Sequence, residues 1–313
     1  MKKEYIILTI IIIALGAYLY FQNSDSTHYT LPQPEAITQS KITKIEIAKK
    51  DGIVSISKED NDWFVGQNKF PADQTKLTPV LKMLEEIKLT ALISESGNYA
   101  RYELDDAGKS TVTAWVNDKV VRKIDIGKTA SSYKHTFVKL DSNKNVYHAA
   151  QNLKSIIDKT EENFVDKSIL TFKPEAAYSV KITDEDKTYS FTKTIDDVKI
   201  DVEKKDSAEK PVPKREEYWL SSTGDKKEKV NIDAFIKAFS NLECNNFVAD
   251  LKKDALSKPI YSVTVTTVNK PNTLSVYQSE KDKDLICTSS KSNFVFNLSA
   301  DKLDKFKELF TKI

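Results

Sequence analysis

The sequence predicts an α+β fold, in which an N-terminal transmembrane helix precedes two tandem, similar modules of antiparallel sheet with packed helices. Two observations lead to this prediction. The chain begins with an apolar run, and the order of strand-like and helix-like segments in its first half recurs in its second half. With 313 residues, 40% of them hydrophobic, the chain is long enough to bury two cores.

Residues 1–21 predict a membrane anchor. Lys2 and Lys3 precede an apolar run from Tyr5 to Phe21, and a spanning helix needs about 20 such residues. A cleaved signal peptide is the alternative, but its apolar region is shorter and ends in small residues. We expect a single-pass anchor in the bacterial cytoplasmic membrane, with the bulk of the chain in the periplasm or outside the cell. Residues 22–40 are polar, contain two prolines and predict a tether.

The first module, residues 41–157, begins with a hairpin. Apolar and polar residues alternate on both sides of the turn dipeptide Asp51-Gly52, and the hairpin is followed by Trp63. Asp73 is suited to cap a helix whose apolar stripe has three- and four-residue spacing: Leu77, Val80, Leu81, Leu84 and Ile87. Strand-like runs at 110–116, 120–127, 135–140 and 145–148 follow, and a helix around Leu153, Ile156 and Ile157 ends the module.

The second module, residues 179–313, repeats this order after a connector at 158–178. Trp219 corresponds to Trp63, and the stretch Ala238–Asp250 corresponds to Val80–Glu95. Further matching apolar positions are Val180, Ile182, Tyr189 and Phe191 in the hairpin, Phe235, Phe239 and Leu242 in the helix, Leu274, Val276, Val295 and Phe296 in the strands, and Leu303 and Phe306 in the closing helix. A charged insertion at 193–215 lengthens the second hairpin.

Composition argues against two classes of partner. The net charge is only +2, and almost all basic residues are lysines, whereas nucleic-acid readers favour arginine. The 7 glycines form no cluster that could cradle a phosphate. We therefore predict no nucleic-acid and no nucleotide binding. Cys244 and Cys287 have two open interpretations, a disulfide or two buried thiols.

Several short motifs resemble one family. They are Trp63 ahead of the segment Phe-Pro-Ala-Asp, Tyr102–Asp106 (YELDD), Asp125–Gly127 (DIG), NVYHA at 145–149, and Phe164–Leu170 (FVDKSIL). With the anchor, they resemble the family catalogued as domain of unknown function 4340. Glu103 stands where that family favours glycine, and no proline follows Asp106. The resemblance implies an accessory subunit of ABC-type or gliding-motility-like transport systems, and it implies no catalytic residue.

Candidate catalytic patterns have simpler explanations. Ser131–Lys134 fits Ser-x-x-Lys, but the partner motifs of penicillin-binding enzymes are missing, so a polar loop is predicted. Gly127–Thr129 lacks the first glycine of a phosphate loop and predicts a strand end and a turn. His28, His135 and His148 have no ligand spacing, although Tyr133, His135 and Tyr147 are candidates for one shared surface.

The adjacent carboxylates at Asp105-Asp106 and at 184–186 (Asp-Glu-Asp) are predicted to form turns rather than an acid–base pair. Trp63 and Trp219 are predicted to be core residues rather than residues that bind a sugar. We thus expect no catalytic, cofactor-binding or metal-binding residues and no cofactor. The predicted function is a non-catalytic, extracytoplasmic, membrane-anchored interaction subunit of an ABC-type transport system. The alternative is a cell-envelope hydrolase or ligand-binding protein with a site between the two modules.

Overall fold

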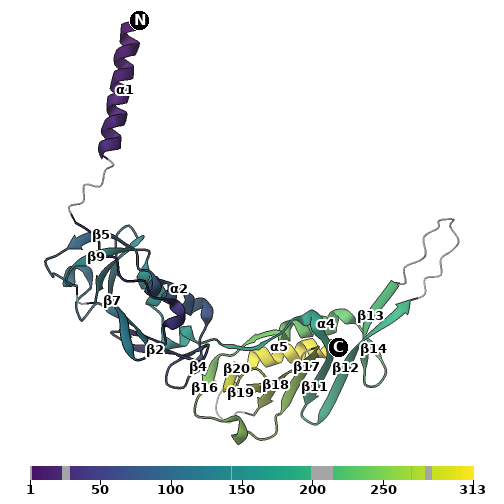
Figure 1. Ribbon diagram of the computed structural model, residues 1–313. Helices are drawn as coiled ribbons and strands as arrows, with labels where there is room; N and C mark the ends of the chain where they lie inside the picture. Colours follow the sequence, from purple (N-terminus) through teal and green to yellow (C-terminus); the bar gives the residue numbers. More distant parts are fainter. Residues whose placement is uncertain (1, 23–28, 142, 199–213, 269, 279–283) are drawn as a thin grey trace. The chain divides into compact units, whose positions relative to one another are not determined.

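The computed structural model describes residues 2–22, 29–141, 143–198, 214–268, 270–278 and 284–313. The chain separates into two compact units, Met1–Val165 and Asp166–Ile313 (Figure 1). Each unit contains one large antiparallel sheet with helices on one face.

The N-terminal segment corrects the first prediction. It forms one helix, α1 (Lys2–Gln22), whose described side chains are exposed. Among the residues that the structure describes, no helix combines the length and the apolar character that a membrane span requires. The predicted transmembrane helix is therefore wrong. Three charged residues open α1, and the apolar run after them is shorter than the about 20 residues of a typical span.

The first unit contains a nine-stranded antiparallel sheet in the order β4-β3-β2-β1-β6-β7-β8-β9-β5. Its strands are β1 (Lys44–Lys49), β2 (Gly52–Glu59), β3 (Asp62–Val65), β4 (Phe70–Pro71), β5 (Leu89–Ser94), β6 (Ser110–Val116), β7 (Lys119–Thr129), β8 (His135–Leu140) and β9 (Val146–Ala150). The predicted hairpin at Asp51-Gly52 and the predicted run of four strands are confirmed. The edge strand β5 was not predicted.

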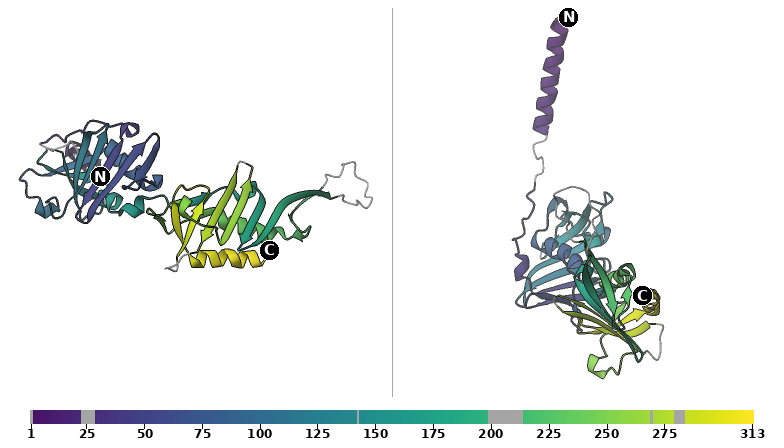
Figure 2. Two further views of the ribbon diagram at one scale, coloured as in Figure 1. Left: turned by 90° about the horizontal axis from the view of Figure 1, so that it is seen from below. Right: turned by 90° about the vertical axis from the view of Figure 1, so that its right-hand side faces the viewer.

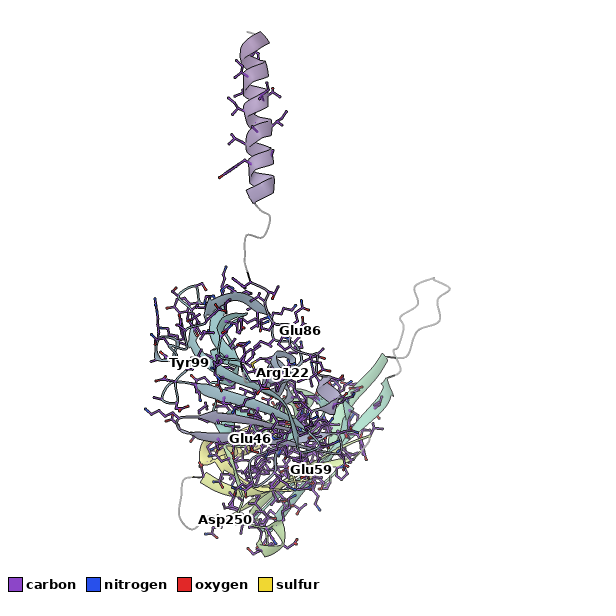
Figure 3. All side chains as sticks on the ribbon, turned by 60° about the vertical axis from the view of Figure 1, so that its left-hand side comes forward. Glu46, Glu59, Glu86, Tyr99, Arg122 and Asp250 are labelled. Atoms are coloured by element: carbon purple, nitrogen blue, oxygen red, sulfur yellow. The ribbon has the colours of Figure 1, made fainter. Side chains whose placement is uncertain are left out.

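Helices cover the inner face of this sheet. They are α2 (Gln74–Glu85) and α3 (Leu153–Ile157), accompanied by the 3-10 turns η1 (Gln39–Lys41) and η3 (Glu161–Phe164), while a third turn, η2 (Ala100–Tyr102), lies in the connection between β5 and β6. The predicted helix cap is confirmed, because the Asp73 carboxylate accepts a hydrogen bond from the Thr75 amide. All five residues of the predicted apolar stripe are buried. Arg122 of β7, labelled in Figure 3, donates to the Leu84 carbonyl at 2.7 Å near the C-terminal end of α2.

The second unit repeats the strand order, as β14-β13-β12-β11-β17-β18-β19-β20-β16. Its strands are β11 (Ala177–Asp184), β12 (Lys187–Val198), β13 (Lys214–Ser221), β14 (Lys226–Lys227), β16 (Asn246–Val248), β17 (Tyr261–Thr267), β18 (Pro271–Tyr277), β19 (Asp284–Ser289) and β20 (Val295–Ser299). A separate two-stranded sheet joins β10 (Ser168–Thr171) to β15 (Asn241–Glu243). Leu242 therefore lies in a strand, not on the helix that precedes it.

Two helices and two 3-10 turns complete the second unit: α4 (Lys229–Phe239), α5 (Ala300–Thr311), η4 (Pro174–Ala176) and η5 (Lys253–Ala255). Figure 2 shows α5, in yellow, along one face of the second sheet. The chain as a whole is mostly antiparallel sheet in two large sheets. The predicted α+β class is corrected accordingly, because segments such as β5 and β10 add strand where none was predicted, and α3 is little more than one turn.

The two sheets also agree in register. In the first, Ile47 pairs with Val112, which pairs with Ile124. In the second, the matching row is Ile182, Val263 and Leu274. All six side chains are fully or almost fully buried and belong to the two cores. The matching alternation in the sequence therefore has a physical basis, since the same sheet positions face a helix layer in both units.

The charged insertion extends a ribbon of the second sheet. Lys193 pairs with Trp219, and Val198 pairs with Lys214, so β12 and β13 continue into the insertion (Figure 1). The rest of the insertion, 199–213, lies outside the described residues.

Candidate functional site: a pocket on the outer face of the first sheet

The chain crosses the outer face of the first sheet between β5 and β6. These strands are far apart in the sheet order, so the connection runs over the strands between them. Tyr99, labelled in Figure 3, begins the 3-10 turn of this crossing segment, 95–109, and its hydroxyl donates to the Lys144 carbonyl. A Cβ atom on Gly127 of β7 would clash with the Tyr102 carbonyl. Glycine at this position therefore lets the crossing segment lie directly on the sheet.

A buried ion pair lies on the same outer face. Asp125 is 4% exposed and accepts a hydrogen bond from the Thr111 hydroxyl at 2.8 Å. Its other carboxylate oxygen lies 3.0 Å from the Lys139 ammonium, which also stands over the Tyr99 ring. A buried carboxylate is tolerated when it is paired in this way. Two residues of the Asp125–Gly127 motif thus support the crossing segment. The Asp125 carboxylate holds the lysine that stands over Tyr99, and Gly127 has no side chain that would clash with the segment.

The crossing segment forms one wall of a pocket of about 680 Å³. We call this the outer-face pocket, and it is lined by Ile93, Arg101, Tyr102, Lys128, Thr129, Ser131, Phe137 and His148. Phe137 of β8 and His148 of β9 are paired in register, and their rings lie 4.6 Å apart. The Tyr102 ring lies 4.9 Å from that of Phe137. Three aromatic rings therefore lie together, and the volume falls within the range of small-ligand sites.

His148 differs from the other lining residues in its electrostatics. Burial, and secondarily the neighbouring His135, lowers the pKa of its imidazole below the ordinary value, so the ring is neutral at pH 7. The two imidazoles are stacked at 5.4 Å. Among the described residues, no group forms a hydrogen bond with the buried His148 Nε2. An unpaired buried nitrogen costs stability, so its presence here needs an explanation beyond folding.

The structure brings several predicted candidates to this pocket. Ser131 and Lys128, from the Ser-x-x-Lys and Gly-Lys-Thr patterns, both line it. β7 ends at Thr129, so the predicted strand end is confirmed at the last residue of the Gly-Lys-Thr pattern, and the turn follows the pattern instead of lying within it. His135 Nδ1 lies 3.2 Å from the Ser132 hydroxyl, next to the motif serine rather than on it. No triad geometry around Ser131 is present among the described contacts.

Other candidates lie elsewhere. Tyr133 is exposed, whereas Tyr147 is buried in the first core and accepts a hydrogen bond from the Asn143 amide. The predicted surface shared by Tyr133, His135 and Tyr147 is therefore not formed. Trp63 and Trp219 are 7% and 1% exposed, which confirms the prediction that they are core residues. His28 lies outside the described residues.

The adjacent carboxylates behave as turn residues with exposed ion pairs. Asp106 pairs with Lys109 at 2.6 Å, and Asp186 with Lys258 at 2.7 Å. The lysine hydrogen bond is the main cause that lowers the pKa of each carboxyl. Within the described ranges, no group of three or more histidine, cysteine, aspartate or glutamate residues is arranged to hold a metal ion.

The two cysteines are buried free thiols, which decides between the two interpretations left open by the sequence. Burial is the main cause that raises the pKa of Cys244 to about 11 and that of Cys287 to about 12. Both thiols are therefore protonated and unreactive at neutral pH.

The outer-face pocket was not predicted from the sequence, although one signal pointed to it. In the alternation of β8 and β9, Thr136, Val138, Tyr147 and Ala149 face inward and are buried. The outward positions between them hold Phe137 and His148, where an exposed sheet face would normally place small polar or charged residues. Aromatic residues at outward positions of neighbouring strands were the available signal.

Comparison with known protein families covers the part of the chain that contains the outer-face pocket. A model of the family described as "Domain of unknown function (DUF4340)" matches residues 63–259, which include every residue that lines the outer-face pocket. No curated protein and no solved structure gives a significant match. The family description names no transport system, so the expected association with ABC-type exporters gains no support from it. On the extent of this match, the chain belongs to the DUF4340 family.

Proposed function

We propose that the protein is a non-catalytic binding subunit, and that it holds a partner at the outer-face pocket of its first sheet. The observation that carries this proposal is the pocket itself. It combines three aromatic rings with two cationic side chains, Arg101 and Lys128, and no carboxylate is among its lining residues. Binding sites typically combine such an apolar floor with a few polar groups that orient the ligand.

The surroundings of Ser131 favour binding over chemistry. A serine nucleophile needs a base within hydrogen-bond reach and a group that orients the base. The nearby imidazole of His135 contacts Ser132 and stacks on His148. The rings therefore support the floor of the pocket.

The class of partner is also a proposal. We propose a subunit of an ABC-type transport complex as the partner to test first, as the resemblance of the sequence motifs implies, with the folded units acting in the cell envelope, outside the cytoplasm. The alternative of a cell-envelope hydrolase stays a prediction, which purified protein tests directly by turnover of envelope substrates.

The test compares the full-length protein with a double variant, Phe137→Ile with His148→Asn. These substitutions introduce the residues that the second sheet carries at the matching positions, Ile286 and Asn297. We expect recovery of crosslinked partners from cells to fall strongly, with an unchanged circular dichroism spectrum. The matched control is Ile286→Val with Asn297→Gln in the second sheet, which should recover partners normally. Equal recovery by both variants would refute the proposal.

A further inference from the structure

The charge around the outer-face pocket is uncompensated. Arg101 belongs to the crossing segment and Lys128 to β7, so the two cations come from different elements. Neither forms an ion pair with any described residue. A second pocket, lined by Lys193, Lys229 and Trp219 in the second unit, has the opposite character. There, Glu217 lies 3.2 Å and 2.7 Å from the two lysines and neutralises them.

Two unpaired cations that line one pocket favour an anionic group. Serine and threonine hydroxyls lie among the same lining residues, at Ser131 and Thr129. The Thr129 hydroxyl donates its proton to the Asn152 side-chain oxygen at 3.1 Å, so it can only accept a hydrogen bond from a ligand. The Ser131 hydroxyl is exposed and can donate to a ligand. The anion would therefore meet Arg101, Lys128 and Ser131.

The anion is better matched by a carboxylate than by a phosphate. Phosphate sites are commonly built from glycine-rich loops whose amides converge on the ligand. Gly127 is the glycine nearest to this pocket in the chain, and its open side is occupied by the Tyr102 carbonyl oxygen. With that side covered, Gly127 does not offer the converging amides of such a phosphate site.

The floor determines what carries the anion. Phe137 and Tyr102 present aromatic rings, Ile93 presents an aliphatic side chain, and His148 is neutral at pH 7. Such a floor is stabilised by covering flat apolar surface, and a ligand ring that packs against these rings adds an aromatic contact to the burial.

We propose that the outer-face pocket binds a carboxylate carried on an aromatic or apolar group. This inference rests on the proposed binding function and names its ligand chemistry. Two sources offer that chemistry: a free aromatic acid, and an acidic residue next to an aromatic residue in a peptide. A peptide can make one further contact, because the pocket residue Ile93 lies in β5, which is the last strand of the sheet order. The free edge of such a strand can pair with an extended peptide.

The experiment titrates the full-length protein with four probes by calorimetry: benzoate, benzamide, phenyl phosphate and the peptide N-acetyl-Phe-Glu-amide. We expect benzoate or the peptide to bind at least about tenfold more tightly than benzamide, because benzamide lacks the charge. Binding by benzoate alone assigns a free acid, and tighter binding by the peptide assigns a protein segment. Failure of both, benzamide as strong as benzoate, or phenyl phosphate stronger than both carboxylates would overturn the proposal.

Two double variants locate the site. Arg101→Gln with Lys128→Gln should weaken the carboxylate probe by about tenfold or more. Lys119→Gln with Lys123→Gln removes the same charge from exposed positions of β7 outside the pocket and should leave affinity within about twofold. An equal loss in both would overturn the inference.

The same variants separate this inference from the function on which it rests. Partner recovery that is lost with Phe137→Ile and His148→Asn, yet kept with Arg101→Gln and Lys128→Gln, would refute the carboxylate and leave the binding function intact. Recovery unaffected by either pair would refute the binding function itself.

Discussion

The inner faces of the two sheets are alike, while their outer faces differ. Both sheets have the same strand order, and both bury matching rows of branched apolar residues beneath helices. On the outer face, Phe137 and His148 of the first sheet correspond in register to Ile286 and Asn297 of the second. Gly127, which the crossing segment covers, corresponds to Tyr277 of the second sheet. Gly127 directly follows the residue of β7 that pairs with a buried position of β8, and Tyr277 directly follows the residue of β18 that pairs with the equivalent buried position of β19.

This difference separates the residues that specify the fold from those available for function. The inner positions must be apolar in both units, because a helix layer covers them and burial supplies the main stabilisation. The outer positions have no such requirement, so each unit is free to differ there. The aromatic and cationic residues of the outer-face pocket are therefore a property of the first unit and not of the repeated architecture.

The largest expected effect tests the similarity of the two cores beneath the inner faces of the sheets. Trp63→Ala and Trp219→Ala should each destabilise their own unit by about 3–5 kcal/mol, because each leaves a cavity in a packed core. Trp219 should cost more, since it is 1% exposed against 7% and its indole donates to Asp233 at 3.1 Å. Hydrogen exchange with mass spectrometry, resolved by unit, is the measurement.

The two losses should be nearly additive, because the residues belong to different units. Trp115→Ala is the matched control, since Trp115 is only partly buried and stands on the outer face beneath Lys44. A smaller loss is expected there. Near-neutral stability of the Trp63 and Trp219 variants would contradict the assignment of both residues to the core.

The next effect tests the crossing segment. Gly127→Ala should destabilise the first unit by about 1–3 kcal/mol, because the added methyl group meets the Tyr102 backbone carbonyl and not a flexible side chain. Weaker binding of the carboxylate probe should accompany the loss, since Tyr102 lines the pocket. Thermal unfolding and the same titrations measure both effects.

Gly224→Ala provides a partial control, because a Cβ there meets no atom within 4 Å, although its φ of +91° imposes a separate backbone cost. That change should affect only the second unit. Normal stability and normal binding of Gly127→Ala would show that the crossing segment does not need this close approach.

The third effect concerns pH. The pKa of His148 is lowered in the folded state, so the unfolded chain binds more protons as the pH falls below about 6.5. His148 should therefore contribute full stability above that pH, and the contribution should be lost as the pH falls through its folded pKa. In His148→Asn, which carries the residue of the second sheet, stability should vary less between pH 7 and pH 5.

Urea unfolding at several pH values, followed in the first unit, measures this difference. The charged and titratable groups near His148 are His135, which stacks on it, and Arg101 and Lys128, which line the same pocket. His135→Asn therefore serves as the companion variant, because it removes the neighbouring imidazole and leaves His148 in place. An unchanged pH dependence of stability in His148→Asn would show that burial of this imidazole does not cause the loss of stability between pH 7 and pH 5.

Most of the repeated fold could be predicted from sequence, because it depends on local pattern. Alternation around Asp51-Gly52 predicted the first hairpin, and the three- and four-residue spacing from Leu77 to Ile87 predicted α2. The edge strand β5 was missed for a physical reason. Its pairing with β9 contains two register shifts, so its alternation is interrupted, and its partner lies far along the chain.

The outer-face pocket could not be predicted because its residues meet only through sheet pairing and the crossing segment. Arg101, Phe137 and His148 are separated by many residues, and no local spacing links them. The apolar N-terminal run led to the opposite error. The apolar run and the lysines before it predicted a membrane span there, whereas no helix of the described residues combines the length and the apolar character that a span requires.

The smallest expected effect concerns Glu103, where the crossing segment of the first unit differs in backbone conformation from the connection between β16 and β17 in the second unit. Glu103 has a φ of +56°, in the left-handed region, where a side chain costs about 1 kcal/mol relative to glycine. It also lies 3.1 Å from Lys154 in a half-exposed ion pair worth about 0–1 kcal/mol. Glu103→Gly should therefore change stability by less than about 1 kcal/mol, whereas Glu103→Ala keeps the strain and loses the pair.

The comparison between these two variants is the test. Glu103→Gly should be more stable than Glu103→Ala by about 0.5–1 kcal/mol, measured by urea unfolding of the first unit. Leu256 ends the matching 3-10 turn of the second unit with a φ of −87°, which any residue adopts. Leu256→Gly should therefore be less stable than Leu256→Ala, the opposite order, because glycine gains nothing there and loses more entropy on folding. The same order at both positions would show that the left-handed backbone at Glu103 is not what distinguishes the crossing segment from the connection between β16 and β17.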